Sequence, residues 1–313
     1  MRGGYFGNIT TLRLVYQGNI GEYHEVIRSN IDTAKIACFG FRPSRIFDGA
    51  HIDTAITTGR KETSSRGSIE TSDFILFTEG NRRTKIENIE YTSTEGFLLG
   101  DEIGDRSGAQ ILPKIGHDDK KEILERLKEQ SDVTFRDVMM REKPESDTHI
   151  LWKRRGVLYW INPMLEKLYE GSEVEPIYFE DKLERDFAFL IQSSSLYYTY
   201  WLTYSNLHHH NWTHIRPFPY PLSSKIEEKE EEIHETARSL WEKMKGTFTQ
   251  SREGRGDFHM RPLKPLIDNV DDLLADIYGL SDDELEYVQN YITDLGENSG
   301  RRAPQDADLS EFD

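Results

Sequence analysis

The stretch Cys38–Lys61, with the sequence CFGFRPSRIFDGAHIDTAITTGRK, constrains the fold of this chain more than any other segment. It begins as an apolar strand and then turns through Arg42–Asp48, a polar segment that contains a proline and is followed by Gly49. It returns at His51–Thr58 with alternating apolar and polar residues, which is typical of a half-buried strand. The pattern predicts two antiparallel strands with one aromatic side chain, Phe47, on the turn that joins them.

Composition sets the class of protein. The 313 residues suffice for two domains or one large domain. The net charge of −17 argues against a general coat for nucleic acid, although a local basic groove can coexist with acidic helices. The single cysteine, Cys38, excludes an internal disulfide and is more simply a small buried residue than a catalytic thiol. Gln192 and Ser193–Ser195 interrupt the apolar run 187–204, which favours a buried helix over a membrane span. We therefore expect a cytoplasmic protein with no membrane partner.

The segments around the opening stretch predict the closing part of an α/β sheet. Strands are expected at 4–10 and 33–40, with a helix near 20–27 between them, and no complete doubly wound sheet fits before residue 62. Beyond it, the patterns predict strands at 74–77 and 85–91, a hairpin of 149–152 with 157–161, helices at 118–130, 184–205, 223–246, 266–278 and 281–293, and an extended proline segment at 216–221.

Two N-terminal segments carry a family resemblance. GGYFGNITTLRL at 3–14 and FGFRPSRIFDGAHIDTAITTGRK at 39–61 resemble the end of the catalytic domain of adenine-specific DNA methyltransferases, where the second segment often reads FG-x-RPSKLF-(D/E)-G. The residues that match in order are Phe39, Gly40, Arg42, Pro43, Ser44, Phe47, Asp48 and Gly49.

The C-terminal half extends the resemblance. FHMRPLKPLID, which leads on to Tyr278-Gly279, resembles the helical signature of large methyltransferases in restriction–modification systems of Type II or IIG. Residues 188–221 resemble the aromatic helix, polar turn and proline exit of that family. The resemblance spans most of residues 3–293 and is weakest at 106–147.

The resemblance implies a role for the turn. An enzyme that methylates a base amino group must take the base out of the helical stack. In this family the aromatic residue at the turn packs against the flipped adenine, which makes Phe47 the implied catalytic-pocket residue. Arg42 and Arg45 would then hold the adjacent phosphates. From the residues alone, a phenylalanine that plugs the edge of the sheet is the simpler interpretation.

Two motifs that methyl transfer requires are missing from the sequence. One is the glycine-rich turn that cradles S-adenosylmethionine, and the other is Asn/Asp-Pro-Pro-Tyr/Phe. The only Asn-Pro pair, Asn162-Pro163, is followed by Met164. We therefore expect a truncated or split enzyme that is not self-sufficient. It would bind no cofactor alone, and S-adenosylmethionine would enter only in an assembly with an N-terminal methyltransferase half.

The expected fold class is α/β, with the partial end of a Rossmann-like methyltransferase sheet, then an α+β target-recognition region and C-terminal helices. The expected domains are 1–62 for the end of the catalytic domain, 63–221 for target recognition, 222–296 for the helical region, and 297–313 for a disordered tail.

A basic turn is the first candidate for contact with double-stranded DNA. Lys153, Arg154 and Arg155 stand together in the predicted hairpin with aromatic residues on both sides, and such a hairpin can grip phosphates. An ordinary exposed turn beside core aromatics explains the same pattern equally well. The flanking aromatics are Trp152, Tyr159 and Trp160.

The segment HHHNWTH at 208–214 is the second candidate. Within it, His209 and Asn211 could contact the DNA backbone or base edges. A metal site is not expected, because neighbouring side chains point in different directions and no carboxylate partner lies nearby in the sequence.

Three functions stay open at this point. The first is the recognition portion of a DNA adenine methyltransferase, completed by its N-terminal half. The second is a non-catalytic DNA-recognition subunit or an inactive remnant of a restriction–modification enzyme. The third, a metal hydrolase built on the histidine segment, predicts stoichiometric metal and is not expected.

Overall fold

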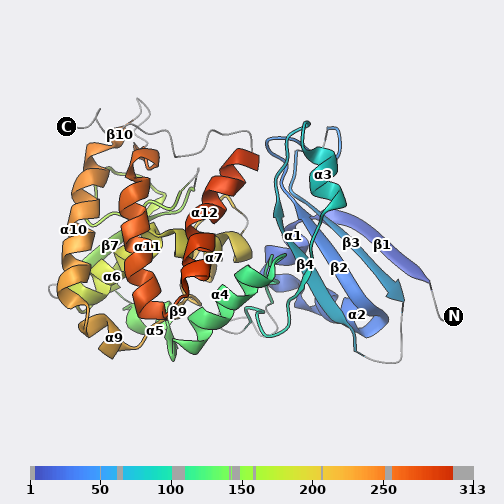
Figure 1. Cartoon of the computed structure of the whole chain (residues 1–313), viewed down its shortest axis with the longest axis horizontal. Coiled ribbons are helices and arrows are strands. Elements are labelled where there is room, and N and C mark those ends of the chain that lie inside the picture. Colours follow the sequence, from blue (N-terminus) through green and yellow to red (C-terminus); the bar gives the residue numbers. More distant parts are fainter. Residues whose placement is uncertain are drawn as a thin grey trace. The chain divides into compact units, whose positions relative to one another are not determined.

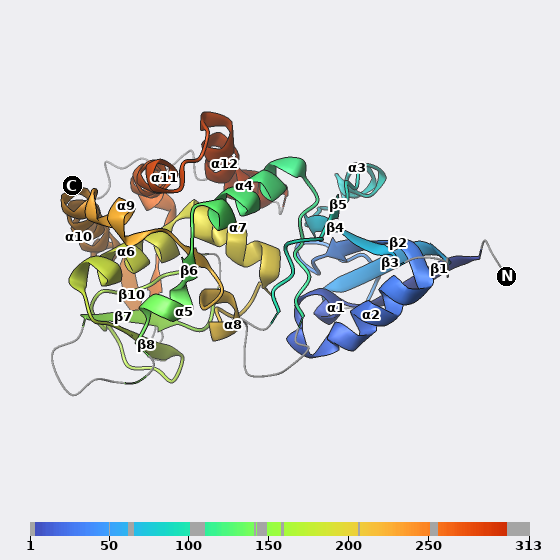
Figure 2. The same ribbon diagram turned by 90° about the horizontal axis from the view of Figure 1, so that it is seen from below.

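The computed structural model describes residues 4–49, 51–61, 66–100, 110–140, 142, 149–157, 160–205, 207–250 and 256–298, with side chains up to 291. The chain divides into two compact units (Figures 1 and 2). Unit 1 comprises Met1–Leu124, Leu202–Asn206 and Asp294–Arg302, and unit 2 comprises Glu125–Trp201, Leu207–Thr293 and Ala303–Asp313. The functional boundaries expected at 62, 221 and 296 stay predictions.

Unit 1 is built on a five-stranded mixed sheet in the order β1-β3-β2-β4-β5. Strand β3 is antiparallel to both β1 and β2, β4 is parallel to β2, and β5 is antiparallel to β4. The predicted antiparallel pair in Cys38–Lys61 is confirmed, since Phe39 pairs with Thr54. The fold is thus of the α/β type, and its Rossmann-like character stays a prediction. The strands are β1 (Tyr5–Thr11), β2 (Ile31–Phe39), β3 (Thr54–Lys61), β4 (Ser68–Ile75) and β5 (Thr92–Ser93).

Helices cover the sheet of unit 1 and connect its strands. Helix α2 (Gly21–Asn30), which links β1 to β2 after the short α1 (Arg13–Tyr16) and η1 (Gly18–Ile20), buries Ile27. A hydrophobic core cluster joins Ala37 and Phe39 of β2 to Phe77, which follows β4. The prediction of a strand at 85–91 is wrong. Helix α3 (Arg82–Glu87) occupies its first part, where Arg83 and Glu87 form an ion pair one turn apart that favours a helix.

In its described residues, unit 2 combines helices with three two-stranded sheets. Strand β7 (His149–Arg154) pairs with β8 (Val174–Phe179), so the hairpin predicted between 149–152 and 157–161 is wrong. Residues 158 and 159, which include Tyr159, lie outside the described residues. The other strands are β6 (Val133–Thr134) with β9 (Pro219–Tyr220), and β10 (Phe248–Gln250) with β11 (Gly256–Phe258).

The C-terminal helices of unit 2 follow the sequence closely. Helix α11 (Lys264–Tyr278) confirms the helix predicted at 266–278. The predicted capping box opens α12 (Asp282–Asn298), because the Ser281 amide donates to Glu284 Oε2 and the Glu284 amide donates to Ser281 Oγ. The shorter elements are α5 (Phe135–Val138), α8 (Trp212–Ile215) and η3 (Arg261–Leu263).

Two predicted helices are each divided. The helix predicted at 184–205 is α6 (Lys182–Ser193) followed by α7 (Ser195–Tyr204), and that predicted at 223–246 is α9 (Ser223–Glu227) followed by α10 (Glu230–Gly246). Ser194 is extended at the first break, and its hydroxyl accepts a hydrogen bond from the Tyr197 amide, so it caps α7.

Helix α4 (Asp118–Glu129) confirms the prediction at 118–130. No described helix is both long enough and apolar enough to span a membrane. The predicted disordered tail begins within α12, and residues 299–313 lie outside the described residues.

Candidate nucleic-acid interfaces

Two segments predicted separately to contact DNA lie side by side in unit 2. The backbone of Gly156 bridges that of His209, and the His210 amide donates to the carbonyl of Arg155 over 2.8 Å. The side chains of Arg155, His208 and His209 are exposed there. One arginine and two imidazoles thus share one stretch of surface, which we call the Arg155 cluster (Arg155, His208 and His209).

The charge of the Arg155 cluster depends on pH. Partial burial lowers the pKa of His209, and the neighbouring Arg155 and His208 lower it further. A neutral imidazole offers one donor and one acceptor, whereas the protonated ring offers two donors. Near neutral pH the arginine supplies the charge of the cluster, and His209 supplies hydrogen bonds.

The other two basic residues of the predicted turn are buried. Lys153 lies with its Nζ atom 2.9 Å from Glu175 Oε2, and burial lowers its pKa. Arg154 pairs with Glu173 and Asp257 over 3.3 Å each. Both residues stand in strand β7, which continues two residues beyond the predicted strand end. Of the three basic residues, Arg155 is the one that the fold exposes.

Trp212 is a residue of this region that the sequence did not single out. Its indole Nε1 donates to Glu175 Oε2 over 2.9 Å. The Lys153 ammonium lies 4.7 Å from the ring centroid and the Arg216 guanidinium lies 5.5 Å from it. Both distances fit cation–π contacts. In the sequence, the feature that could have identified Trp212 is its position as an aromatic residue between basic neighbours. Asn211, which directly precedes it, is half-buried.

The histidines do not converge on a metal. His210 is buried, and its Nε2 lies 2.7 Å from the hydroxyl of Tyr197, while His209 is exposed on the surface. Burial drives the pKa of His210 well below its usual value. Within the described ranges, no group of three or more His, Cys, Asp or Glu side chains could hold a metal ion.

In unit 1, the predicted base-stacking residue stands on the surface. Phe47 is 39% exposed, whereas its neighbour Ile46 packs against the core cluster of Ala37, Phe39 and Phe77. The residue that plugs the sheet is therefore Ile46, and the Phe47 ring is available to a partner.

The turn that carries Phe47 is held at both ends. The Phe41 amide donates to Asp53 Oδ1 over 3.0 Å, and Arg82 on α3 donates to the Ile46 carbonyl over 2.6 Å. Arg42 is exposed, with its guanidinium 5.0 Å from the Phe41 ring, and Arg45 is half-buried. The tethered turn thus carries one exposed aromatic ring, Phe47, and two arginines earlier in its sequence, Arg42 and Arg45.

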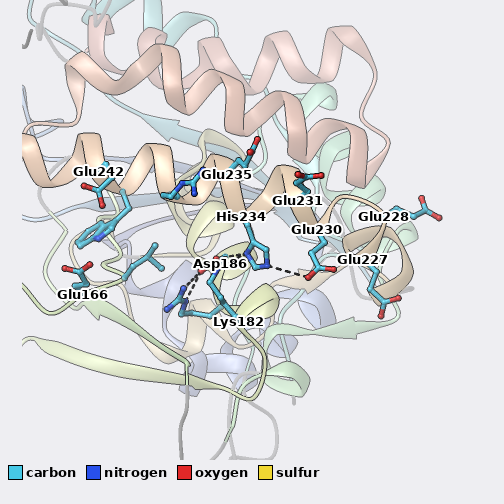
Figure 3. Close-up of a pocket in the computed structure, with 14 residues that line it drawn as sticks. Glu166, Lys182, Asp186, Glu227, Glu228, Glu230, Glu231, His234, Glu235 and Glu242 are labelled. Carbon is cyan, nitrogen blue, oxygen red and sulfur yellow. Dashed lines mark hydrogen bonds and ion pairs between the residues drawn. The ribbon is translucent and has the colours of Figure 1, made fainter.

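A groove of about 820 Å³ lies between α6 and the acidic segment of α9 and α10 (Figure 3). At its floor, the carboxylate of Asp186 contacts Lys182, Arg185 and His234. Burial opposes ionisation of Asp186, but the hydrogen bonds from Lys182 and Arg185 outweigh it and leave the pKa below its usual value. The contacts tie α6 to α10, and the acidic rim disfavours nucleic acid here.

No family model and no curated protein matches the sequence. Among solved structures, the type IIG restriction endonuclease BpuSI is similar at 11% identity and a TM-score of 0.35, over 98% of this chain and 48% of that one. The chain thus spans about half the length of that structure.

Proposed function

We propose that this chain is the C-terminal, target-recognition portion of a site-specific DNA adenine methyltransferase of a restriction–modification system. A separate N-terminal half would supply the cofactor site and the catalytic Asn/Asp-Pro-Pro-Tyr/Phe motif. The complete assembly would transfer a methyl group from S-adenosylmethionine to adenine in double-stranded DNA. The observation that carries this proposal is the exposed Phe47 ring on a tethered turn that also contains Arg42 and Arg45.

The turn supports base capture by its physical properties. A flipped adenine needs a flat apolar surface, and stacking of one base on an aromatic ring contributes about 1–3 kcal/mol. Phe47 offers such a surface without giving up core packing, because Ile46 fills the core position instead. Arg42 and Arg45 would hold the phosphates beside the extruded nucleotide.

The strand-to-helix turn after β1 offers no glycine-rich cradle for S-adenosylmethionine. Strand β1 ends at Thr11 and passes through Leu12 into α1 at Arg13, so this strand-to-helix turn has no glycine. Close approach of a cofactor to such a turn needs glycine. The proposal therefore assigns the cofactor to the N-terminal half and no methyl-transfer step to the residues of this chain alone.

The Arg155 cluster would serve DNA recognition in unit 2. Its guanidinium can contact a phosphate or a guanine edge, and the two histidines can hydrogen-bond base edges or the backbone. Lys153 and Arg154 directly precede Arg155, and their ion pairs with Glu175 and Glu173 would hold this part of β7 in place.

Methylation by the reconstituted enzyme tests the proposal. The chain is mixed with the polypeptide encoded upstream of it, duplex DNA and radiolabelled S-adenosylmethionine. We expect Phe47→Ala to lower kcat/KM by about 5- to 150-fold, which corresponds to the loss of one base–aromatic stack. Phe47→Tyr, which keeps the aromatic face, is the matched control and should stay near the wild-type rate. Equal rates for all three proteins would contradict the role of Phe47.

A second candidate is a non-catalytic DNA-recognition subunit or an inactive remnant. The observation that favours it is that the Arg155 cluster belongs entirely to this chain. In that case the chain alone binds duplex DNA, and no methylation follows when the upstream polypeptide is added.

A further inference from the structure

Strand β1 forms an open edge of the sheet in unit 1. The Lys61 amide donates to the Gly4 carbonyl and the Leu12 amide donates to the Asp53 carbonyl, which fixes the even-numbered residues as those bonded to β3. The backbone N–H and C=O groups of Tyr5, Gly7 and Ile9 therefore point away from β3. None of them hydrogen-bonds another residue that the structure describes.

This edge lacks the features that usually protect an exposed strand. Residues 4–12 (GYFGNITTL) contain neither a charged residue nor a proline, and β1 pairs with β3 without a register shift. Edge strands of soluble proteins commonly carry a lysine, a proline or a bulge that prevents pairing with another chain. A Cβ atom at Gly7 would meet nothing within 4 Å, so the packing of this chain does not require a glycine there. A glycine in a strand often marks a close approach by another backbone.

Apolar side chains are exposed on both sides of the edge. Tyr5 is 89% and Ile9 is 58% exposed on one face of the sheet. On the opposite face, α2 exposes Tyr23 at 37% and Val26 at 58%. The Tyr23 hydroxyl accepts a hydrogen bond from Asn8, which places this part of α2 beside β1. A partner that buried all four side chains would need a strand at the edge and a further layer on each face.

A second copy of the chain does not meet this requirement. Antiparallel pairing of two β1 strands would satisfy the backbone groups. The two-fold axis would stand perpendicular to the sheet, so both copies of α2 would lie on the same face. Tyr5 and Ile9 of both copies would stay uncovered on the other face. An α/β partner, with helices on both faces of its own sheet, covers both.

We propose that the outer edge of β1 is the docking site of the catalytic half, which adds a strand to β1 and a helix to each face beside it. The identity of the partner rests on the proposed function, whereas the open edge rests on the geometry of unit 1. Docking here would join the two sheets through backbone hydrogen bonds and bury Tyr5, Ile9, Tyr23 and Val26.

Residue-resolved hydrogen exchange with the upstream-encoded polypeptide tests the site. In the complex we expect new protection at the amides of Tyr5, Gly7 and Ile9. The amides of Phe6, Asn8 and Thr10 should change little, because β3 already binds them. Protection that grows only at the even-numbered amides, or nowhere in β1, would overturn the docking site.

Two edge variants provide a second measurement by calorimetric titration with the same polypeptide. Gly7→Pro removes one outward N–H group and leaves the bonds to β3 in place, and Ile9→Lys adds a charge to the edge. We expect each to weaken the complex at least about 10-fold. Leu222→Lys, at a 41% exposed apolar residue in unit 2, is the matched control and should bind like the wild type. Unchanged binding by both edge variants, or no binding by the wild type, would overturn the proposal.

The outcomes separate docking from function. A complex that protects the odd-numbered amides but transfers no methyl group keeps the docking site and overturns the proposed activity. Methylation by a complex in which the odd-numbered amides stay unprotected keeps the proposed activity and overturns the docking site. Dimerisation of the chain alone, with protection of the same amides, would show that a second copy occupies the edge.

Discussion

The buried carboxylate of Asp271 accepts a hydrogen bond from the backbone amide of Ser195, with 2.8 Å between Oδ1 and N. The Leu196 amide donates to the same oxygen over 3.3 Å. Asp271 belongs to α11, which is far from α7 in the sequence. Its carboxylate therefore accepts hydrogen bonds from the first amides of α7, which have no partner within their own helix. This contact and the Ser194 cap stabilise the break that divides the predicted long helix.

Replacement of Asp271 should change how stability depends on pH. Burial raises the pKa of Asp271 to about 7. Because this folded-state pKa lies above that of an unfolded aspartate, the folded state holds the extra proton between about pH 4 and pH 7. The Asp271 contribution therefore makes the free energy of unfolding fall as pH rises through that range. Asp271→Asn keeps an acceptor for Ser195 and loses this contribution, so the stability of the variant in urea unfolding should rise relative to the wild type from pH 4 to pH 7.

Asp271→Ala provides the complementary variant. It leaves the amides of Ser195 and Leu196 without their acceptor, and we expect a loss of about 1–2 kcal/mol in the free energy of unfolding. A variant as stable as the wild type at pH 7, with an unchanged pH profile, would contradict the capping role.

Arg155→Ala should weaken DNA binding through the loss of one exposed charge. A phosphate contact contributes about one unit to the slope of log K against log salt. We expect this slope to fall by about one in fluorescence anisotropy with labelled duplex DNA. Lys153→Met is the internal comparison, because the Lys153 ammonium is buried against Glu175. A larger salt effect for Lys153→Met than for Arg155→Ala would contradict the placement of the interface.

DNA affinity should rise as the solution becomes more acidic. The pKa of His209 is lowered, so the ring gains its proton only at acid pH, where it adds a positive charge beside Arg155. We expect tighter binding as pH falls from about 7 to 5.5, and His209→Asn should remove part of that change. Identical pH profiles for the two proteins would exclude His209 from the interface.

Neighbouring substitutions on the Phe47 turn should separate stability from function. Ile46 packs in the core cluster, so Ile46→Ala should lower the free energy of unfolding by about 1–3 kcal/mol. Phe47 is exposed, so Phe47→Ala should change stability by less than about 0.5 kcal/mol. Thermal unfolding of both variants checks this. A larger loss of stability for Phe47→Ala would mean that Phe47 is a packing residue.

Local patterns predicted much of the fold. The strand pair of Cys38–Lys61, helix α11 and the Ser281 capping box depend on periodicity and on side chains close in sequence. Two of the differences from these predictions came from distant contacts. Strand β7 pairs with β8, which is further along the sequence than the predicted partner 157–161. The break at Ser194 is stabilised by Asp271, which lies on a different helix, α11.

The candidate sites show the same division. The sequence predicted that Phe47 lies on a turn, and it identified the basic turn at 153–155 and the histidine segment at 208–214. That these two segments contact each other at Gly156 and His209 depends on the fold. The burial of Lys153 and Arg154 was not visible either. Their partners, Glu175 and Glu173, come from strand β8 and the turn before it, and no spacing rule links them to β7.

The N6-methyladenine content of plasmid DNA, measured by mass spectrometry, tests whether this chain takes part in adenine methylation. The plasmid is recovered from cells that have no adenine methylation of their own and that express this chain with the upstream-encoded polypeptide. We predict N6-methyladenine when both polypeptides are present, a marked loss with Phe47→Ala, and none with either polypeptide alone. Absence of N6-methyladenine in the doubly expressing cells, or an equal amount without this chain, would contradict the central claim.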